Sequence, residues 1–216
     1  MLQIGLQGVL PQVFNGQLPS DPVSDVWGAD LSFDKGRAYL INAPSGRGKS
    51  SLCSYIYGLR DDYQGVISFD GQPVSGLGAG RWDAVRQNEI GALFQDLRLF
   101  GELTAVENVM VKSALTGFCD ETKASEMLSE VGLADKLQTP VRLLSIGQQQ
   151  RVAFVRMLCQ KADFWLLDEP VSHLDHANAE IMARMLKREM ERTGAGVLVT
   201  TIGHDLPFDY DECLML

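Results

Sequence analysis

The sequence feature that most constrains this chain is a glycine-rich segment between an apolar run at 38–42 and an expected helix from Lys49 to about Leu59. Small residues let backbone N–H groups close around phosphates, and the start of the following helix adds its positive end. The segment matches the P-loop pattern and reads Ala43-Pro44-Ser45-Gly46-Arg47-Gly48-Lys49-Ser50-Ser51. A strand, a P-loop and a helix in this order predict an α/β phosphate-binding core.

The residue types in this segment predict separate contacts with phosphates. The backbone from Pro44 to Ser51 would surround the β- and γ-phosphates, and Lys49 would supply a mobile cation to their oxygens. Ser50 offers a hydroxyl to Mg²⁺. Ala43 stands where the pattern usually has its first glycine, and alanine is tolerated there only if its φ is negative.

The rest of the chain alternates between expected strands and helices, which favours an α/β fold with a mostly parallel sheet. Two of the strands are continuously apolar, as in a parallel sheet buried on both faces. A turn-rich stretch at 15–22 separates the first strand from the P-loop region. Strands are expected at 2–14, 38–42, 66–69, 90–94, 164–167 and 197–200, and helices at 49–59, 122–131 and 179–192.

The apolar strand at 164–167 ends in two carboxylates, Asp168 and Glu169. Ligands of open α/β sheets bind at the carboxyl ends of the strands, so both side chains should face the P-loop. We expect Asp168 to hold Mg²⁺, directly or through water. Glu169 would act as the general base that polarises an attacking water.

Composition excludes several other classes of protein. Lys and Arg total 19 against 28 Asp and Glu, and this net charge of −9 opposes binding to nucleic acid. No window is apolar for long enough to span a membrane. The four cysteines lack metal-site spacing and are expected to be core or inert thiols: Cys53, Cys119, Cys159 and Cys213.

A third segment, 144–153, reads Leu-Ser-Ile-Gly-Gln-Gln-Gln-Arg-Val-Ala. Ser145 followed by Gln148 forms a capping box, which predicts that a helix begins at Ser145. Lying between the P-loop and the Asp-Glu pair, this segment resembles the signature motif of ABC-type ATPases. The resemblance covers nearly the whole chain, with the motifs in the family's order.

This resemblance implies an ABC-type P-loop NTPase that uses ATP and Mg²⁺. The family pattern makes Gln95 the Q-loop glutamine that contacts Mg²⁺ and the attacking water, His204 the switch histidine at the γ-phosphate, and Phe14 the aromatic that stacks on adenine. It also makes 172–175 the D-loop. In the family two chains pair head to tail, so the signature residues would contact ATP held by the other chain's P-loop: Ser145, Gly147 and Gln148.

The family fold implies one ATPase domain over residues 1–216. Its core, with an N-terminal antiparallel β subdomain, would comprise 1–96 and 146–216, and an α-helical subdomain would be inserted at 97–145. Three departures from the family pattern are present: Ile146 replaces a glycine, Val171 replaces a threonine, and residues 201–203 lengthen the connection to His204.

The segment 84–109 resembles the group that serves lipoprotein release, macrolide efflux and cell division (LolD, MacB and FtsE-like). The resemblance implies an ATP hydrolase that forms a homodimer or a heterodimer with a similar chain. It also implies that a permease holds the protein at the cytoplasmic face of the inner membrane. Leu97, Leu99 and Phe100 are candidates for the permease contact, unless they pack beneath the insertion.

Two alternatives stay open: a soluble assembly ATPase, as in iron–sulfur cluster scaffolding, and the ATPase of an amino-acid-type importer. A DNA-maintenance ATPase is disfavoured because the gap from Ser51 to Leu144 is too short for a long coiled coil.

Overall fold

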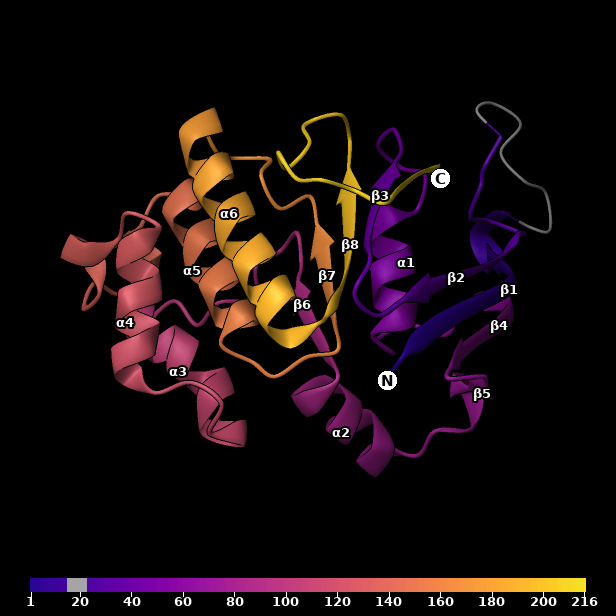
Figure 1. Cartoon of the computed structure of the whole chain (residues 1–216), viewed down its shortest axis with the longest axis horizontal. Coiled ribbons are helices and arrows are strands. Elements are labelled where there is room, and N and C mark those ends of the chain that lie inside the picture. The colour runs from indigo at the N-terminus through magenta and orange to yellow at the C-terminus, as the bar shows by residue number, and fades with distance from the viewer. Residues whose placement is uncertain (15–22) are drawn as a thin grey trace.

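The computed structural model describes residues 1–14 and 23–216, so the turn-rich stretch predicted at 15–22 lies outside the described residues. Within them, a five-stranded parallel sheet has the order β6-β7-β8-β3-β9. Figure 1 shows its strands running in one direction through the middle of the molecule. The strands are β3 (Ala38–Asn42), β6 (Ile90–Leu93), β7 (Phe164–Asp168), β8 (Gly196–Thr201) and β9 (Glu212–Met215).

A second, antiparallel sheet has the order β2-β1-β4-β5. Its strands are β1 (Gln3–Pro11), β2 (Asp30–Asp34), β4 (Tyr63–Phe69) and β5 (Gln72–Pro73). The expected strand at 2–14 was too long, because the chain turns after Pro11 into a 3₁₀ helix at Gln12–Phe14. The two sheets confirm the predicted fold class, a mostly parallel α/β core with an antiparallel β part near the N-terminus.

Six α-helices accompany the sheets in the described part of the chain. Helices α3 and α4 lie at the end of the molecule farthest from the antiparallel sheet, and α5 packs against both (Figure 1). The predicted helix start at Ser145 is confirmed, because both arms of its capping box form. The helices are α1 (Lys49–Ile56), α2 (Ala79–Asn88), α3 (Ala105–Thr116), α4 (Glu121–Glu130), α5 (Ile146–Leu158) and α6 (His176–Thr193).

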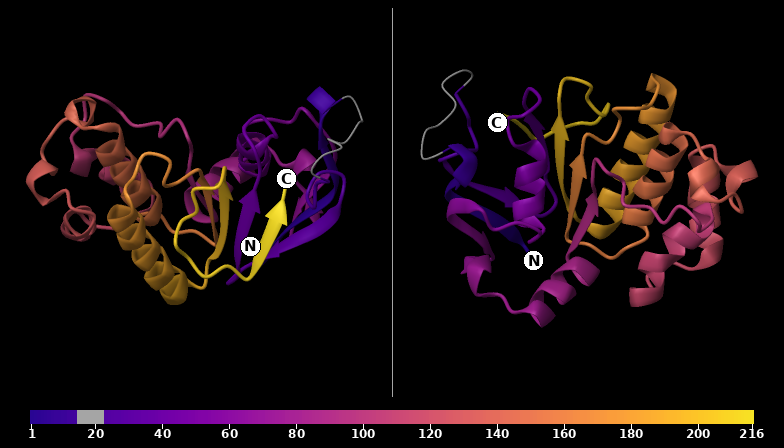
Figure 2. Two further views of the ribbon diagram at one scale, coloured as in Figure 1. Left: turned by 90° about the horizontal axis from the view of Figure 1, so that it is seen from above. Right: turned by 180° about the vertical axis from the view of Figure 1, so that it is seen from behind.

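The parallel sheet separates two hydrophobic cores. One core lies against α3–α6, and the other lies against α1 and the antiparallel sheet. The view from above in Figure 2 shows these two groups of elements on opposite sides of the parallel sheet. Alternate residues of β7 enter opposite cores: Trp165 and Leu167 enter the first, while Phe164 and Leu166 enter the second. This burial on both faces explains why β7 is apolar from Phe164 to Leu167 and β8 from Val197 to Val199.

The prediction about three apolar side chains needs correction. Leu97 is buried and Leu99 is partly buried against the core that contains α3–α6, so of the three proposed contact residues only Phe100, 54% exposed, is open to a partner. Three of the cysteines are buried, as expected of core residues; Cys213 is exposed on β9, and its being an inert thiol stays a prediction. In the part of the chain that the structure describes, no helix combines the length and apolar character needed to cross a bilayer.

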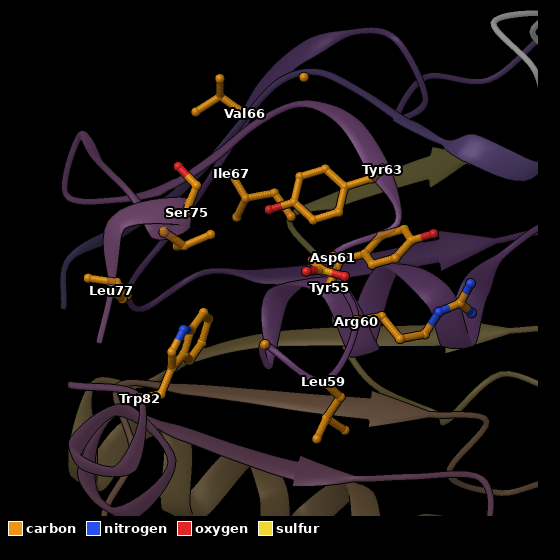
Figure 3. A pocket seen from close by; sticks show the side chains of 13 residues that line it. Tyr55, Leu59, Arg60, Asp61, Tyr63, Val66, Ile67, Ser75, Leu77 and Trp82 are labelled. Atoms are coloured by element: carbon orange, nitrogen blue, oxygen red, sulfur yellow. The ribbon is translucent and has the colours of Figure 1, made fainter. Parts of the chain in front are cut away.

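A pocket of about 610 Å³ opens beyond the last turn of α1, between that helix, β4 and α2 (Figure 3). Tyr55, Tyr63 and Trp82 supply its aromatic walls, and Arg60 and Asp61 lie along its rim. The P-loop precedes the opposite end of α1. The pocket is therefore separate from the phosphate-binding region.

Candidate functional site

The predicted site residues gather at the carboxyl edge of the parallel sheet. The P-loop follows β3, Asp168 ends β7, and Gln95 comes shortly after β6. Because neighbouring parallel strands end at the same edge, residues distant in sequence meet there. In Figure 1 this edge lies at the top of the sheet, beside the first turn of α1.

The backbone of the P-loop has the conformation that its sequence requires. Gly46 and Gly48 have φ of 82° and 99°, in the left-handed region that favours glycine. Ala43 has a negative φ, is fully buried, and donates its N–H to the carbonyl of Thr201 at 3.1 Å. The alanine that departs from the usual glycine pattern is therefore accommodated without strain.

The ammonium of Lys49 lies inside the turn of the P-loop. Its Nζ donates to the carbonyls of Ala43 at 2.9 Å and Pro44 at 3.1 Å, and the side chain is only 5% exposed. It also lies 3.4 Å from Oε1 of Glu169, whose side chain is 10% exposed. A cation and a carboxylate are thus held together where little solvent reaches them.

Gln95 connects this pair to the start of α1. Its Nε2 donates to Oε2 of Glu169 at 3.4 Å, and its Oε1 accepts from Oγ of Ser50 at 3.4 Å. Lys49, Glu169, Gln95 and Ser50 therefore form one continuous polar cluster built from three separate segments. The tertiary structure brings together four of the residues that the sequence singled out.

The Asp-Glu pair is held by the neighbouring strand β8. Thr200 Oγ1 donates to Oδ1 of Asp168 at 2.6 Å, and the two side chains are almost completely buried. Glu169 has φ of 50°, which is unusual for a residue with a side chain, and its N–H donates to the Thr200 carbonyl at 3.1 Å. The turn after β7 directs the Glu169 carboxylate toward Lys49 and Gln95.

The three residues predicted to hold Mg²⁺ carry hard oxygen donors, which this ion prefers. Ser50 supplies a hydroxyl, Gln95 an amide oxygen, and Asp168 a carboxylate. Ser50 and Gln95 already lie within 3.4 Å of each other, and Asp168 immediately precedes the Glu169 that Gln95 contacts. This donor set fits a magnesium ion.

The signature segment lies at the N-terminus of α5. Gln148 N–H donates to Ser145 Oγ at 3.3 Å, and Ser145 N–H donates to Gln148 Oε1 at 2.9 Å. Gly147 packs so closely that an added Cβ would lie 2.8 Å from the carbonyl oxygen of His173. Ser145 and Ile146 are exposed, so the start of this helix faces away from the core.

The side chain of Gln150, also on α5, connects the signature segment to the Asp-Glu turn. Its Nε2 donates to the Glu169 carbonyl at 3.1 Å, and its Oε1 accepts from the His173 N–H at 3.3 Å. The 172–175 segment, predicted to be the D-loop, therefore lies beside α5 and the Asp-Glu turn.

The structure does not bring every predicted residue into the Lys49–Glu169 cluster. Phe14 is partly buried and packs against the core on the antiparallel-sheet side, and His204 is exposed on the loop after β8. The Ser51 hydroxyl accepts from Arg60 at 3.0 Å. The roles assigned to Phe14, His204 and Ser51 stay predictions.

Three residues at the site escaped the sequence reasoning: Thr200, Gln150 and Trp27. Thr200 lies one residue before the end of β8 and pairs in register with Asp168, so the polar residues that follow the apolar part of the strand were a usable signal. Gln150 lies within the signature segment but received no role. The Trp27 indole, 1% exposed, donates to the Arg47 carbonyl at 3.0 Å, and no sequence pattern marks it.

A family model described as ABC transporter matches residues 26–172, more than half of the chain. The chain belongs to the ABC transporter family. The predicted family is thereby confirmed. Among the relatives, the lipoprotein-releasing system ATP-binding protein LolD of Roseobacter denitrificans is 32% identical over 91% of this chain and 87% of its own length. The cytochrome c biogenesis ATP-binding export protein CcmA of Nitrosomonas europaea is 33% identical over 80% of each chain.

An uncharacterised ABC transporter ATP-binding protein of Mycobacterium tuberculosis is 31% identical over 96% of this chain, which spans 63% of that relative's length. Among solved structures, the dimeric ATP-binding cassette MJ0796 in a post-hydrolysis state with ADP and Pi superposes with a TM-score of 0.78. It is 28% identical, with 94% of this chain and 88% of MJ0796 covered. The ABC cassette fold predicted from sequence is confirmed.

Proposed function

We propose that this ABC transporter chain binds ATP at its P-loop and hydrolyses it as one half of a head-to-tail pair. The observation that carries the proposal is the cluster of Lys49, Glu169, Gln95 and Ser50 at the carboxyl edge of the sheet. It joins a phosphate-binding loop to a carboxylate and to an amide that can orient water. Positioning and electrostatics supply most of the catalysis in phosphoryl transfer.

Each residue of the cluster has a proposed task. When ATP binds, its phosphates replace Glu169 as the partner of Lys49. The Glu169 carboxylate is then free to act as the general base and to accept a proton from the attacking water. Gln95 orients that water, because its amide already reaches Glu169. Mg²⁺, held by Ser50, Gln95 and Asp168, would neutralise charge on the phosphate oxygens. Phe14 and His204 are proposed to reach the adenine and the γ-phosphate.

The second half of the site is proposed to come from the signature segment of another chain. Ser145 presents the N-terminus of the thirteen-residue helix α5 at the surface, where it favours an anion. Beside it, Leu143 and Ile146 are 63% and 49% exposed, as expected of residues that a partner covers. The partner is a second copy of this chain or a similar ATPase, and the dimeric arrangement of MJ0796 supports the pairing.

The variant Glu169→Gln tests this function. It should bind MgATP with parental affinity, turn over roughly 10²- to 10⁴-fold more slowly, and accumulate an ATP-bound dimer in size-exclusion chromatography. Glu126→Gln, the same change on the exposed side of α4, is the matched control and should hydrolyse ATP at the parental rate. Parental turnover in Glu169→Gln would move the base elsewhere, for example to His204.

We further propose that residues 97–145 form a helical insertion through which the chain drives a permease, which would hold it at the inner face of the membrane. The relatives' names, an export protein and a lipoprotein-releasing system, support a transport role of this kind. Near Gln95, a groove of about 260 Å³ separates this region from the core. Phe100 and Leu115, 54% and 60% exposed, lie along it.

Three cations also line this groove: Arg98, Lys112 and Arg156. Burial, together with the neighbouring charges of Arg156 and Arg86, lowers the pKa of Lys112. Lys112 donates to the Tyr57 hydroxyl and the Arg86 carbonyl, so its contacts in the described chain are with neutral groups. Arg156 donates to the carbonyls of Arg98 and Leu97, whereas Arg98 is already paired with Asp96 at 3.1 Å. The positive charge of Lys112 and Arg156 suits a short permease helix that carries carboxylates.

Co-purification tests the permease contact. Phe100→Asp should lose the permease from a membrane extract while the isolated chain keeps its basal ATPase rate. Leu59→Asp changes an apolar residue of similar exposure outside the groove and should retain the permease. Recovery of the parental chain only with a soluble assembly factor would contradict the transport role and favour the scaffold alternative. Recovery with an importer permease would favour the importer alternative.

A further inference from the structure

The P-loop needs an external support, because the two glycines that give it its shape also make it flexible. Gly46 and Gly48 have φ of 82° and 99°, and glycine loses more conformational freedom on ordering than any other residue. A loop that must present several N–H groups to phosphates binds best when its shape is fixed in advance. Contacts behind the loop therefore matter for its affinity.

Trp27 makes such a contact. Its indole Nε1–H donates to the Arg47 carbonyl at 3.0 Å, and its ring lies so close to Gly48 that an added Cβ would be 3.0 Å from Cζ2. The ring also meets Tyr55 of α1 edge-on, with centroids 6.3 Å apart. Trp27 thus fills the space between the P-loop and the helix that follows it.

Trp27 is itself held firmly in place. Its backbone N–H donates to Ser24 Oγ at 2.7 Å, and the next residue, Gly28, donates to the Val9 carbonyl at 2.8 Å. The N–H of Asp25 donates to the Met215 carbonyl at 2.8 Å. These bonds tie the short segment to β1 and β9, so the indole is a fixed support.

We propose that Trp27 is a positioning residue for nucleotide binding. The Arg47–Gly48 peptide is planar and trans, so its C=O and N–H point in opposite directions. By holding the Arg47 carbonyl behind the loop, the indole directs the Gly48 N–H toward the side where phosphates bind. This inference rests on the proposed ATP-binding function, and it assigns to Trp27 part of the preorganisation of the P-loop.

Calorimetry with MgADP on the full chain tests the proposal. Trp27→Phe keeps an aromatic ring but removes the N–H, and it should raise the dissociation constant roughly three- to tenfold, in the range of a single uncharged hydrogen bond. With MgATP, KM should rise by a similar factor while kcat at saturation stays within about twofold, because Trp27 touches no reacting group.

Trp165→Phe is the matched control. Trp165 is also fully buried, but its Nε1 has no hydrogen-bond partner among residues 1–14 and 23–216, so the same substitution removes ring volume without removing a hydrogen bond. It should lower thermal stability and leave MgADP affinity unchanged. Ser24→Ala, which removes the acceptor for the Trp27 N–H, should weaken MgADP binding in the same direction and serves if Trp27→Phe does not fold.

Unchanged affinity in Trp27→Phe, or in Ser24→Ala where that variant replaces it, would overturn the proposal. Equal weakening in Trp165→Phe would also overturn it, because the effect would then be a general softening of the core. Absence of MgADP binding by the parental chain is a different result, and it would instead contradict the proposed ATP-binding function.

Discussion

Replacing Thr200 by valine should destabilise the protein, because it removes one buried hydrogen bond and little else. Thr200 Oγ1 lies 2.6 Å from Oδ1 of Asp168, and the two side chains are 0% and 3% exposed. Valine is β-branched like threonine and nearly the same size, so β8 should keep its conformation and no cavity should form. The Asp168 carboxylate would lose a donor that water cannot easily replace.

The expected loss of stability follows from the charge of the acceptor. A hydrogen bond to a charged group contributes about 1.5–3 kcal/mol, roughly twice the contribution of a neutral pair. For a chain of this size, each kcal/mol corresponds to about 2–4 °C in Tm. Thr200→Val should therefore melt about 3–12 °C below the parental protein.

Differential scanning calorimetry of nucleotide-free protein measures this difference. Thr200→Ser is the matched control, because it keeps the hydroxyl and loses one methyl group, at a cost of about 1 kcal/mol. It should melt between the parental protein and Thr200→Val. If the Tm of Thr200→Val equals or exceeds the Tm of Thr200→Ser, the hydroxyl contributes no more to stability than the methyl group does. That result would refute the reasoning about Asp168.

Three further predictions concern the P-loop, the dimer and acid stability. Lys49→Ala should abolish tight MgATP binding in calorimetry, since it removes the cation inside the P-loop; unchanged affinity would contradict the P-loop assignment. Ser145→Arg should prevent the MgATP-dependent dimer seen by size exclusion in the Glu169→Gln background while the monomer still binds ATP; a persisting dimer would place the signature outside the interface. Burial raises the pKa of Asp163, but hydrogen bonds from Lys35 at 2.5 Å and the Met1 amino group at 2.7 Å outweigh burial and leave that pKa lowered. A lowered carboxyl pKa stabilises the fold above the unfolded value near 4 and loses that effect as pH falls through the folded value, so Asp163→Asn should melt below the parental protein at pH 7 and by a smaller margin at about pH 3. An equal gap at both pH values would show that the ion pairs do not cause it.

Local patterns determined much of the fold. The P-loop lies between β3 and α1 as predicted, and the capping box at Ser145 begins α5. These features depend on residues adjacent in sequence, where backbone conformation and capping act directly. The elements that were missed are short or largely polar, such as β2, β5 and α2. Of the residues of α2, only Val85 is buried. Without a clear apolar period, such segments carry little signal.

The contacts that make the site were decided by the tertiary structure. The strand order β6-β7-β8-β3 brings Gln95, Glu169 and Lys49 together, yet each strand's own sequence is compatible with several neighbours. The same limit applied to Leu97 and Phe100: both are apolar, and only packing shows that the first is buried and the second exposed. Trp27 reaches the P-loop through the folding of a distant segment against it. Sequence alone determined which chemistry the chain carries, because residue types and their local spacing encode it, whereas the pairing of distant side chains arises only when the whole core is packed.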